Sequence, residues 1–297
     1  MSSINEENLI RLLNHHCKVD ELMASPHLSY IGKSAWSTFY RLNSRDKEYF
    51  VKLADTPLQV DILNAELQNL KLLAKTETIK IPRLHWSCFT EDQAVLVSDY
   101  ILEHPTPQAK SYTQAAIALA ELHQNHNVTF GASKNNYIGA LPQQNTTKTH
   151  IAAEHYLYDR ILPQANLAAQ RKLLSSEEYR RFETLFKLLN ELIPEEPPSL
   201  IHGDLWQGNF LIHAKDHSPY FIDPASSYSI REMDISMTLL FGGFPALFYN
   251  AYNEVFPLTK GWQERVPLFQ LYYLLVHLNL FGKTYKQDVM NIVSLYT

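Results

Sequence analysis

Asp204, Asn209 and Asp223 are the residues of this 297-residue chain whose types and spacing best suit chemistry on a charged substrate. Asp204 and Asn209 stand five positions apart in IHGDLWQGNF, and Asp223 follows 14 positions after Asn209. The residues between them predict a tight hairpin with strands at 210–212 and 220–222, and a hairpin brings its two ends together. Asn209 and Asp223 could therefore share a hard divalent cation such as Mg²⁺, with phosphate oxygens as its other ligands.

Asp204 would then remain free of the metal. A free carboxylate beside a metal-bound phosphate can hold a substrate hydroxyl and accept its proton as the phosphoryl group is transferred. The segment from His202 to Asn209 matches the H-x-D-x-x-x-x-N pattern of protein kinases, with Gly203 where those enzymes carry arginine. Each residue type is common in turns on its own, but the joint spacing favours the catalytic interpretation. His202 is predicted to order the loop through hydrogen bonds rather than to react.

A bound nucleotide such as ATP also needs a cation for its inner phosphates. Lys52 lies in the apolar run YFVKL, and Glu66 follows 14 positions later in a predicted helix. Because a half-buried lysine without a partner is costly, we expect these two side chains to form an ion pair. The alternative is an exposed strand lysine and a solvated helix glutamate. The expected phosphate loop, IGKSAWSTFY, has only Gly32, so Ser34, Ser37 and local amides would have to contact the phosphates.

The segment GDLWQGN also has a superficial likeness to metallophosphatase sequences. Those two-metal sites need a D-x-H upstream and further histidines. The sequence contains no D-x-H, and its 13 histidines are scattered, so this alternative is disfavoured.

The part of the chain before about residue 100 predicts an antiparallel sheet with one helix. Thr56 can cap that helix, with Pro57 in its first turn and an apolar stripe from Val60 to Ala74. The predicted strands cover residues 28–31, 37–42, 49–53, 86–89 and 94–97.

The remainder predicts helices. They are expected at 113–126, 151–162, 176–193, from Arg231, at 245–254 and at 264–281. The sequence thus predicts an α+β, two-lobed, protein-kinase-like fold. It has a β-rich nucleotide-binding lobe at 1–100 and a larger helical catalytic and substrate lobe at 101–297. A cleft between two such lobes, joined near Asp99 to Pro107, is a natural ligand site.

Composition limits the classes of partner. Hydrophobic residues make up 45% and charged residues 19%, as in an ordinary globular protein, and the net charge of −5 argues against general nucleic-acid binding. Cys17 and Cys88 form no C-x-x-C motif, which suits a reducing compartment. No secretory signal is visible at the start, and the apolar tract Val266 to Gly282 is too short and too interrupted to span a bilayer. We expect a cytoplasmic protein without membrane contact, as a monomer or weak dimer.

The sequence resembles the fructosamine kinases, also called ketosamine-3-kinases, which are relatives of aminoglycoside and choline kinases. The similarity spans nearly the whole chain. Its motifs include FVKL, NAELQNL, NYIG, PQQN, HGDLWQGN, FIDPASSY, REMDISM, FGGF and LYYLLVHLNLFG. HGDLW followed by DPA is the most specific of these features.

The resemblance implies ATP- and Mg²⁺-dependent phosphorylation of a sugar hydroxyl on a ketoamine, giving a 3-phosphate that is lost and frees the amine. It implies that Asp204 is the base, that Asn209 and Asp223 bind magnesium, and that Lys52 and Glu66 hold the phosphates. It also implies that Val97 to Ile101, including Asp99 and Tyr100, form the adenine-binding hinge. It implies that Trp206 forms a wall of the sugar pocket and that Asp234 braces the catalytic loop.

The sequence departs from the family at several points. Lys33 and Ser34 stand where paired glycines are usual, and Tyr228-Ser229-Ile230 replaces a Tyr-Gly-His-type stretch. These departures leave the acceptor open between fructosamines, ribulosamines and erythrulosamines. Two other interpretations also remain at this stage: a kinase for another small alcohol, such as an aminoglycoside or a choline-like amine, and a nucleotide-binding pseudokinase.

Overall fold

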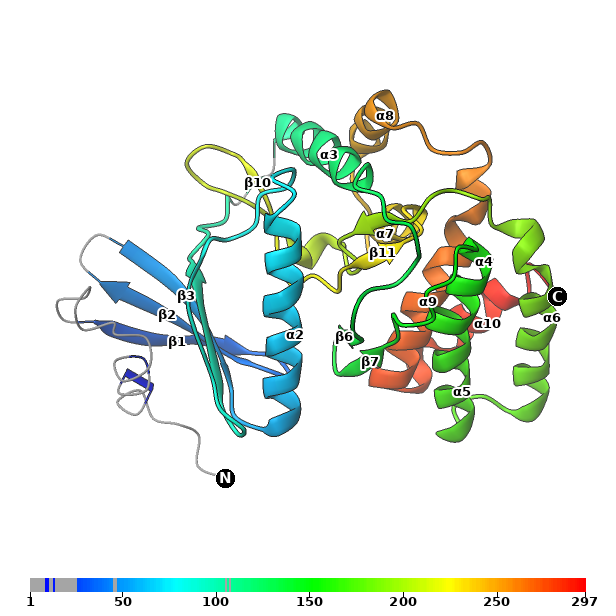
Figure 1. Ribbon diagram of the computed structural model, residues 1–297, viewed down its shortest axis with the longest axis horizontal. Coiled ribbons are helices and arrows are strands. Elements are labelled where there is room, and N and C mark those ends of the chain that lie inside the picture. The colour runs from blue at the N-terminus through cyan, green and yellow to red at the C-terminus, as the bar shows by residue number, and fades with distance from the viewer. Residues whose placement is uncertain (1–8, 11–12, 14–25, 45–46, 105, 107) are drawn as a thin grey trace.

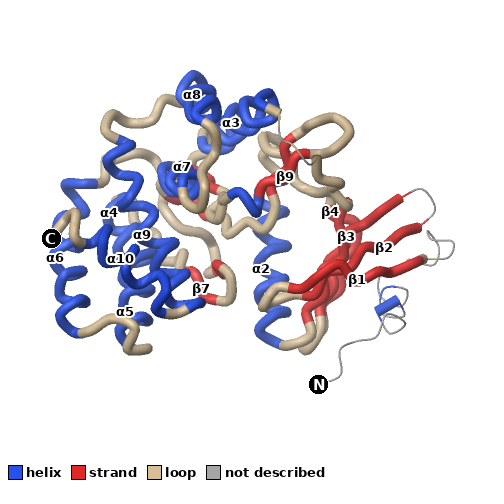
Figure 2. The backbone as a smooth tube through the Cα atoms, turned by 180° about the vertical axis from the view of Figure 1, so that it is seen from behind, coloured by secondary structure: helices blue, strands red, loops and turns tan. Residues whose placement is uncertain are grey.

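The structure is a computed structural model, and Figures 1 and 2 show it from opposite sides. It describes residues 9–10, 13, 26–44, 47–104, 106 and 108–297. Most of the N-terminal segment, including Cys17, lies outside the described residues. The stretch on which the prediction of no secretory signal rests lies there too. So do residues 105 and 107 of the expected connection between the lobes.

A five-stranded antiparallel sheet forms the N-terminal part of the described chain, called here the sheet region. Its strands lie in the order β1-β2-β3-β5-β4. They are β1 (His27–Lys33), β2 (Thr38–Ser44), β3 (Lys47–Ala54), β4 (Leu84–Phe89) and β5 (Ala94–Asp99). All five predicted strands are confirmed, each extended by one or two residues at one or both ends, although β2 begins one residue later than predicted.

Helix α2 (Pro57–Ala74) covers one face of this sheet and stands between the sheet and the rest of the molecule (Figure 1). The Thr56 side chain accepts a hydrogen bond from the backbone of Gln59, and Pro57 occupies the first turn. Leu63 and Leu67 pack against Leu96 of β5 in one apolar cluster. The predicted cap is therefore confirmed, and so is the apolar stripe except at its end, where Ala74 is exposed and Leu73 is buried instead.

The helical region follows and is larger. Its helices are α3 (Ala109–His123), α4 (Ala152–His155), a π-helix (Tyr156–Ile161), α5 (Leu162–Gln170), α6 (Ser176–Leu192), α7 (Glu232–Leu239), α8 (Ala246–Val255), α9 (Trp262–Phe281) and α10 (Lys286–Val293). Short 3₁₀ turns cover Gln207–Asn209 and Lys283–Tyr285. The α+β organisation predicted from the sequence is confirmed.

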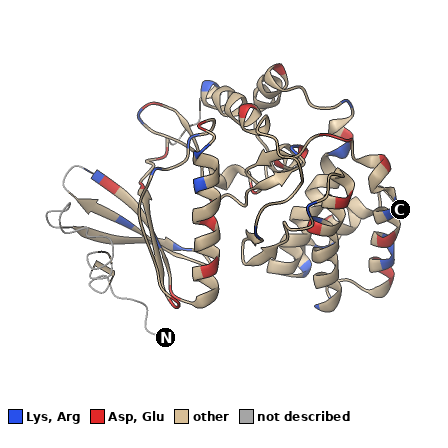
Figure 3. Ribbon diagram, viewed as in Figure 1, with Lys and Arg blue, Asp and Glu red and all other residues tan. Residues whose placement is uncertain are grey.

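Helix α9 explains the apolar tract that could be mistaken for a membrane segment. Leu268, Phe269, Leu271 and Leu275 are fully buried in the core of the helical region, so the helix is apolar on nearly every side. Within the residues that the structure describes, none of the helices combines the length and apolar character needed to cross a bilayer. Figure 3 shows acidic and basic residues interspersed along α2 and α6.

Three pairs of short antiparallel strands hold the loops between the helices. They are β6 (Asn136–Ile138) with β7 (Leu141–Gln143), β8 (Ser199–Ile201) with β11 (Ser227–Ser229), and β9 (Phe210–Ile212) with β10 (Pro219–Phe221). Only the β9–β10 hairpin was predicted. Strands of three residues show too little alternation to be recognised in a sequence, so the other two pairs were missed.

The predicted helix at 151–162 differs most from the structure. The chain is helical from Ala152 to Gln170, but residues 156–161 form a π-helix in the middle. Pro163 lies in the first turn of α5, where its missing N–H is tolerated, so it does not end the helix. Helix α10 was not predicted, and α3 begins four residues earlier and ends three residues earlier than expected.

Candidate active site

The loop after β8 carries Asp204, and a buried carboxylate fixes its backbone. The N–H groups of His202 and Gly203 donate to the two oxygens of Asp234, at 2.7 and 2.8 Å. Asp234 lies in α7 and also receives a hydrogen bond from the His123 ring. Although burial alone would raise it, the hydrogen bond from His123 keeps the pKa of Asp234 below its ordinary value. A charged carboxylate therefore clamps the start of the loop.

His202 links this loop to the end of the hairpin. Its Nε2 donates to the backbone carbonyl of Ile222 at 2.9 Å, and its Nδ1 accepts from the N–H of Asp204 at 3.3 Å. Both ring nitrogens are thus used within the protein. Burial lowers the pKa of His202, in agreement with a neutral ring that has one donor and one acceptor nitrogen.

The β9–β10 hairpin brings its two ends together. Phe210 pairs with Phe221, and the N–H of Ile222 donates to the carbonyl of Asn209 at 3.0 Å. Asn209 therefore lies beside the residue that precedes Asp223. The convergence expected from the sequence is present in the structure.

Asn209 and Asp204 are in direct contact. The amide nitrogen of Asn209 donates to the backbone carbonyl of Asp204 at 2.8 Å and to its carboxylate at 3.1 Å. This use of the amide nitrogen leaves the amide oxygen of Asn209 available as a ligand. Burial, together with the negative charge of Asp223, raises the pKa of Asp204 to about 7.

Lys52 in β3 joins the two parts of the molecule. Its ammonium lies 2.8 Å from Glu66 in α2 and 2.5 Å from Asp223. Burial by itself disfavours the charged ammonium, but the two carboxylates outweigh it and raise the pKa of Lys52. Asp223 has a φ of +54°, a conformation that is uncommon for a residue with a side chain. The ion pair between Lys52 and Glu66 that the sequence predicts is therefore present, and Asp223 also binds the Lys52 ammonium.

Hard oxygen ligands suitable for magnesium are present at Asn209 and Asp223. The Asp223 side chain is 42% exposed, so it remains accessible from the cavity. Among the described residues, no group of three or more His, Cys, Asp or Glu side chains is arranged so that it could hold a metal ion. The donor set therefore fits an ion whose remaining ligands come from phosphates and water, and it does not fit a metal held by protein alone.

Two adjoining cavities open beside these residues. One, of about 400 Å³, lies against the sheet and contains Lys52, Glu66 and Asp223 together with Asp99, Tyr100 and Ile101. The other, of about 390 Å³, contains Asp204, Asn209, Trp206 and Ser34 and shares Lys52, Glu66 and Asp223 with the first.

Only part of the expected hinge lines the first cavity. Asp99, Tyr100 and Ile101 line the first cavity, and Asp99 is fixed by its contact with His85 at 2.6 Å. Val97 does not line it, because its side chain is fully buried in the core on the opposite face of the sheet. Neighbouring side chains of a strand point to opposite faces, so Leu96 and Ser98 line the cavity in its place.

The loop between β1 and β2 is organised by Ser34. Its hydroxyl oxygen accepts hydrogen bonds from the N–H groups of Trp36 and Ser37, at 3.2 and 3.1 Å. The hydroxyl thus supports its own turn, although Ser34 and Ser37 both line the second cavity. Gly32 lies at an irregularity in the pairing of β1 with β2 and lines neither cavity.

Trp206 stands at the edge of the second cavity. Its side chain is held against Gly208, where a Cβ atom would lie only 2.3 Å from the indole ring. Its ring also meets that of Phe241 edge-on, with centroids 6.4 Å apart. The residue is 38% exposed, so its ring is available to a ligand.

Three buried amide side chains near the site were missed from the sequence. Asn69, Gln143 and Asn136 donate to the carbonyls of residues 224, 225 and 226, at 2.8, 3.0 and 2.9 Å. We call Asn69, Asn136 and Gln143 the amide clamp. It holds three successive peptide groups directly after Asp223. The motifs NYIG and PQQN were the available signal, but sequence alone could not show what they contact.

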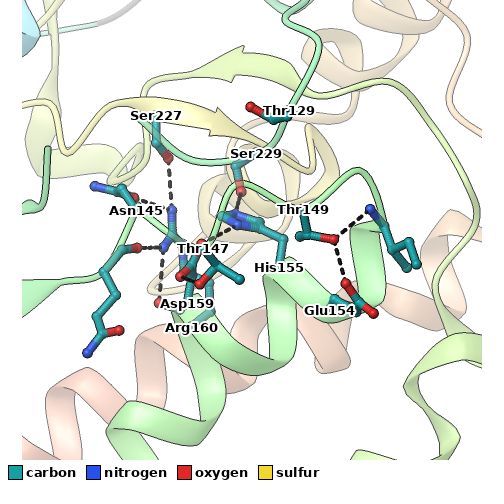
Figure 4. A network of polar contacts seen from close by, with 12 residues as sticks. Thr129, Asn145, Thr147, Thr149, Glu154, His155, Asp159, Arg160, Ser227 and Ser229 are labelled. Carbon is teal, nitrogen blue, oxygen red and sulfur yellow. Dashed lines mark hydrogen bonds and ion pairs between the residues drawn. The ribbon is translucent and has the colours of Figure 1, made fainter. Parts of the chain in front are cut away.

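A second layer of polar contacts supports the amide clamp (Figure 4). Asn145 donates to Asn136 at 2.7 Å, and the buried guanidinium of Arg160 donates to Asn145 and to Ser227 at 2.9 and 2.8 Å. Arg160 comes from the π-helix. The interior of the helical region is therefore connected to the segment that follows Asp223.

Comparison with known proteins identifies the family. A family model described as fructosamine kinase matches residues 14–296. A probable ketoamine kinase of Enterococcus faecium is 37% identical over 259 residues, which cover 86% of this chain and 90% of the relative. A crystal structure from Thermobifida fusca that is named for fructosamine-3-kinase has a TM-score of 0.81 at 34% identity, covering 90% of this chain and 92% of that one.

More distant structures share the fold alone. Spectinomycin phosphotransferase, solved with ADP and spectinomycin, has a TM-score of 0.56 at 15% identity over 99% of this chain and 95% of that one. The two-lobed protein-kinase-like fold expected from the sequence is thereby confirmed.

Proposed function

This chain belongs to the fructosamine kinase family and is an ATP-dependent phosphotransferase with a hydroxyl acceptor, and we propose that its acceptor is a sugar hydroxyl of a ketoamine. The observation that carries the proposal is the convergence of four side chains at one cavity: Lys52, Asp204, Asn209 and Asp223. Their types correspond to the phosphate cation, the base and the two metal ligands of a kinase.

The nucleotide would occupy the cavity against the sheet. Asp99, Tyr100 and Ile101 would contact the adenine, and the ammonium of Lys52, held by Glu66, would contact the inner phosphates. Asn209 and Asp223 would hold magnesium, which when bound neutralises charge on the phosphates. Gly32 and Ser34 would place the loop after β1 over the phosphates.

The acceptor would enter the second cavity. Asp204 would accept the proton of the sugar hydroxyl, and the hydrogen bonds that the N–H groups of His202 and Gly203 donate to Asp234 would fix the position of its carboxylate. His202 would hold the loop against the hairpin without exchanging a proton with substrate. Trp206 would pack on the C–H groups of the sugar, as aromatic side chains do.

The product accounts for a role in removing sugar adducts from amines. With the phosphate on the 3-hydroxyl, tautomerisation of the ketoamine to its enaminol places the ester at an allylic carbon. Inorganic phosphate can then leave with the electron pair of the C–O bond. Water hydrolyses the resulting iminium ion, which releases the amine and a dicarbonyl sugar derivative.

Magnesium-dependent consumption of ATP with a panel of acceptors tests this proposal. The panel contains fructosamines, ribulosamines and erythrulosamines together with an aminoglycoside and choline. Turnover that is confined to ketoamines, with phosphate on the sugar, is the expected result. Turnover of only the aminoglycoside or choline would overturn the acceptor assignment, and nucleotide binding without any turnover would indicate a binding module.

Asp204→Asn tests the assignment of the base. Removal of the acceptor carboxylate should lower turnover roughly 10²- to 10⁴-fold, because proton transfer contributes that much, while nucleotide affinity stays near normal. Asp216→Asn is the matched control, since Asp216 lies in the exposed turn of the same hairpin. Equal turnover in the Asp204 variant and the unaltered chain would remove Asp204 as the base.

A further inference from the structure

Trp36 connects the loop between β1 and β2 to the helical region. Its indole ring lies against Gly139, in the turn between β6 and β7, where a Cβ atom would be 3.3 Å from Cζ2 and 3.4 Å from Cη2 of the ring. The same Cβ atom would be 2.9 Å from Cδ1 of Leu280 in α9. The ring and Leu280 therefore occupy the space into which a side chain at position 139 would extend.

This contact lies at the second cavity. Trp36 lines the cavity from the sheet region, while Gly139 and Leu280 line it from the helical region. The β6–β7 pair is separated from most of the sheet by α2 (Figure 1), so the loop reaches past Ala65 and Glu66 of α2, which line the same cavity. The ring of Trp36 thus forms a part of the cavity wall that joins the two regions of the molecule.

The turn around Trp36 presents its side chain in a defined direction. The N–H of Ser34 donates to the carbonyl of Ser37 at 2.8 Å, and the hydroxyl of Ser34 accepts from the N–H groups of Trp36 and Ser37. Trp36 is half-buried although it belongs to a surface loop. Its contact with Gly139 and Leu280 removes apolar ring surface from water, which stabilises the loop in this position.

The contact also compensates for the scarcity of glycine in this loop. Several glycines allow the backbone amides of a kinase phosphate loop to approach the phosphates closely. This loop has Lys33 and Ser34 where paired glycines are usual, so its backbone adapts less freely to a bound nucleotide. A tryptophan that attaches the loop to the helical region provides order that does not depend on wrapping the phosphates.

The β6–β7 pair also holds the chain after Asp223. Asn136 and Gln143 of the amide clamp come from its two strands, and they donate to the carbonyls of residues 226 and 225. Gly139 lies in the turn at the opposite end of the same pair. The loop between β1 and β2 and the segment after Asp223 are therefore both attached to one hairpin.

Water is the competitor that this contact would exclude. The two cavities share Lys52, Glu66 and Asp223, so the terminal phosphate of ATP would lie where the cavities join. A water molecule at that junction could attack the terminal phosphorus and give its proton to Asp204, while ADP leaves with the electron pair of the broken P–O bond. ATP would then be consumed without an acceptor, and closure of a site against water prevents this side reaction.

We propose that Trp36 is a positioning residue that holds the loop between β1 and β2 across the second cavity and keeps water away from the terminal phosphate. This inference rests on the proposed positions of the nucleotide and the acceptor. It adds a residue that sets the ratio of phosphoryl transfer to ATP hydrolysis.

Two rates measured in one preparation test the inference. The first is ADP formation from ATP and magnesium without an acceptor, and the second is the additional ADP formation with a saturating ketoamine. In Trp36→Ala the ratio of the second rate to the first should fall at least roughly tenfold, because hydrolysis rises and transfer loses its alignment. Misfolded chain contributes to neither rate, so it cancels from the ratio.

Trp36→Phe gives a graded version of the same test. Phenylalanine keeps an aromatic ring but lacks the Cζ2 and Cη2 atoms that reach Gly139, so its ratio should lie between those of Trp36→Ala and the unaltered chain. Trp86→Phe is the matched control, since Trp86 lies in β4, packs against Tyr49 and lines neither cavity. A fall of equal size in Trp86→Phe would overturn the assignment to Trp36.

The remaining outcomes are distinct. A ratio in Trp36→Ala equal to that of the unaltered chain would overturn the inference, even if both rates decrease, while ketoamine turnover would still support the kinase function. If the unaltered chain phosphorylates no ketoamine, the proposed acceptor fails. Hydrolysis without an acceptor then decides the inference alone: a higher rate in Trp36→Ala supports it, and an equal or lower rate overturns it.

Discussion

Lys52 is a side chain on which two distant parts of the sequence depend. It pairs with Glu66, 14 positions away, and with Asp223, 171 positions away, at 2.8 and 2.5 Å. Removing the ammonium would leave two carboxylates close together in a poorly solvated site, and repulsion between them would displace one or both.

Lys52→Met should therefore lower turnover roughly 10²-fold and weaken nucleotide binding, because one charged phosphate contact is lost. Lys71→Met provides the control, since Lys71 is exposed on α2 and lines neither of the two cavities that Lys52 lines. Steady-state kinetics with varied ATP would measure both effects. Kinetics like those of the unaltered chain would exclude Lys52 from phosphate binding.

His155 makes the stability of the fold depend on pH. Its ring is fully buried, with Nδ1 at 2.9 Å from Asp159 and Nε2 at 2.8 Å from the Ser229 hydroxyl (Figure 4). Burial, aided by the positive charge of Arg160, lowers the pKa of His155 to about 4. In the unfolded chain a histidine has a pKa of about 6.5. Between these values the unfolded chain binds a proton that the folded chain does not, so the free energy of unfolding falls as the pH decreases.

We expect a loss of roughly 3 kcal/mol from this group as the pH decreases from about 6.5 to about 4. Denaturant titrations at a series of pH values would measure it. His155→Gln should be less stable at pH 7.5 but show a shallower pH dependence in this window, whereas His150→Gln, with an exposed ring, should keep the original slope. A slope that is equally steep in His155→Gln would contradict the prediction.

At this scale the sequence predicted residue types better than residue orientation. Asp204, Asn209 and Asp223 could be grouped from the sequence because the two ends of a short hairpin must lie close together. Val97 was placed in the nucleotide site although its neighbours Leu96 and Ser98 face the cavity. A strand that is buried on both faces has no polar alternation in its sequence, so the face of each residue could not be assigned.

Among the elements, α2 has two roles. Its sheet-facing side packs on β5, while Glu66 and Asn69, three residues apart and so on neighbouring turns, reach the catalytic segment. The amide clamp thereby fixes α2 and the chain after Asp223 relative to each other. Helix α2 and the amide clamp therefore set the positions of both Glu66 and Asp223.

Asn69→Leu should expose this dependence. It leaves the carbonyl of residue 224 without a partner, which costs about 1–3 kcal/mol, and it removes one of the two acceptors of the Asn136 amide nitrogen. Because the clamp positions Asp223, kcat should fall by a larger factor than the KM for the ketoamine rises, even though Asn69 also lines the second cavity. Asn64→Leu, at an exposed position of the same helix, is the control. A fall in stability with unchanged kcat would reduce the clamp to a structural role.

Elements with strong local signals were predictable, and those made by tertiary contacts were not. Thr56, Pro57 and the apolar stripe are sufficient to define α2, because capping and periodicity are local properties. The β6–β7 pair has three residues in each strand, and Asn136 and Gln143 are buried only because the chain after Asp223 lies across them. No pattern within those segments indicates that contact.

The residues proposed to bind the nucleotide lie on both sides of one cavity. Lys52 and Tyr100 come from the sheet region, and Leu211 and Asp223 come from the helical region. A ligand bound there contacts both regions in the folded chain and neither in the unfolded one. Binding should therefore stabilise the entire fold rather than one part of it.

ATP with magnesium should raise the melting temperature by several degrees. At a ligand concentration 100 times Kd the stabilisation is about 2.7 kcal/mol, and a chain of this size gains roughly 2–4 °C for each kcal/mol. A chelator that removes magnesium should reduce the shift, and Asp223→Ala should abolish the part that depends on magnesium. Asp92→Ala, in the exposed turn between β4 and β5, should respond like the unaltered chain. A shift in Asp223→Ala that still requires magnesium would exclude Asp223 as a ligand.

Gly203 has a consequence for how such an enzyme can be controlled. Its φ is +88°, and a Cβ atom there would lie 2.2 Å from the carbonyl oxygen of Ala225. An arginine therefore cannot be accommodated at the position where protein kinases carry one. Protein kinases use arginines to read a phosphate placed on their activation segment, and so to switch between idle and competent forms. With that receptor excluded by backbone packing, residue 203 of this chain cannot read a phosphate in the way the arginine of protein kinases does.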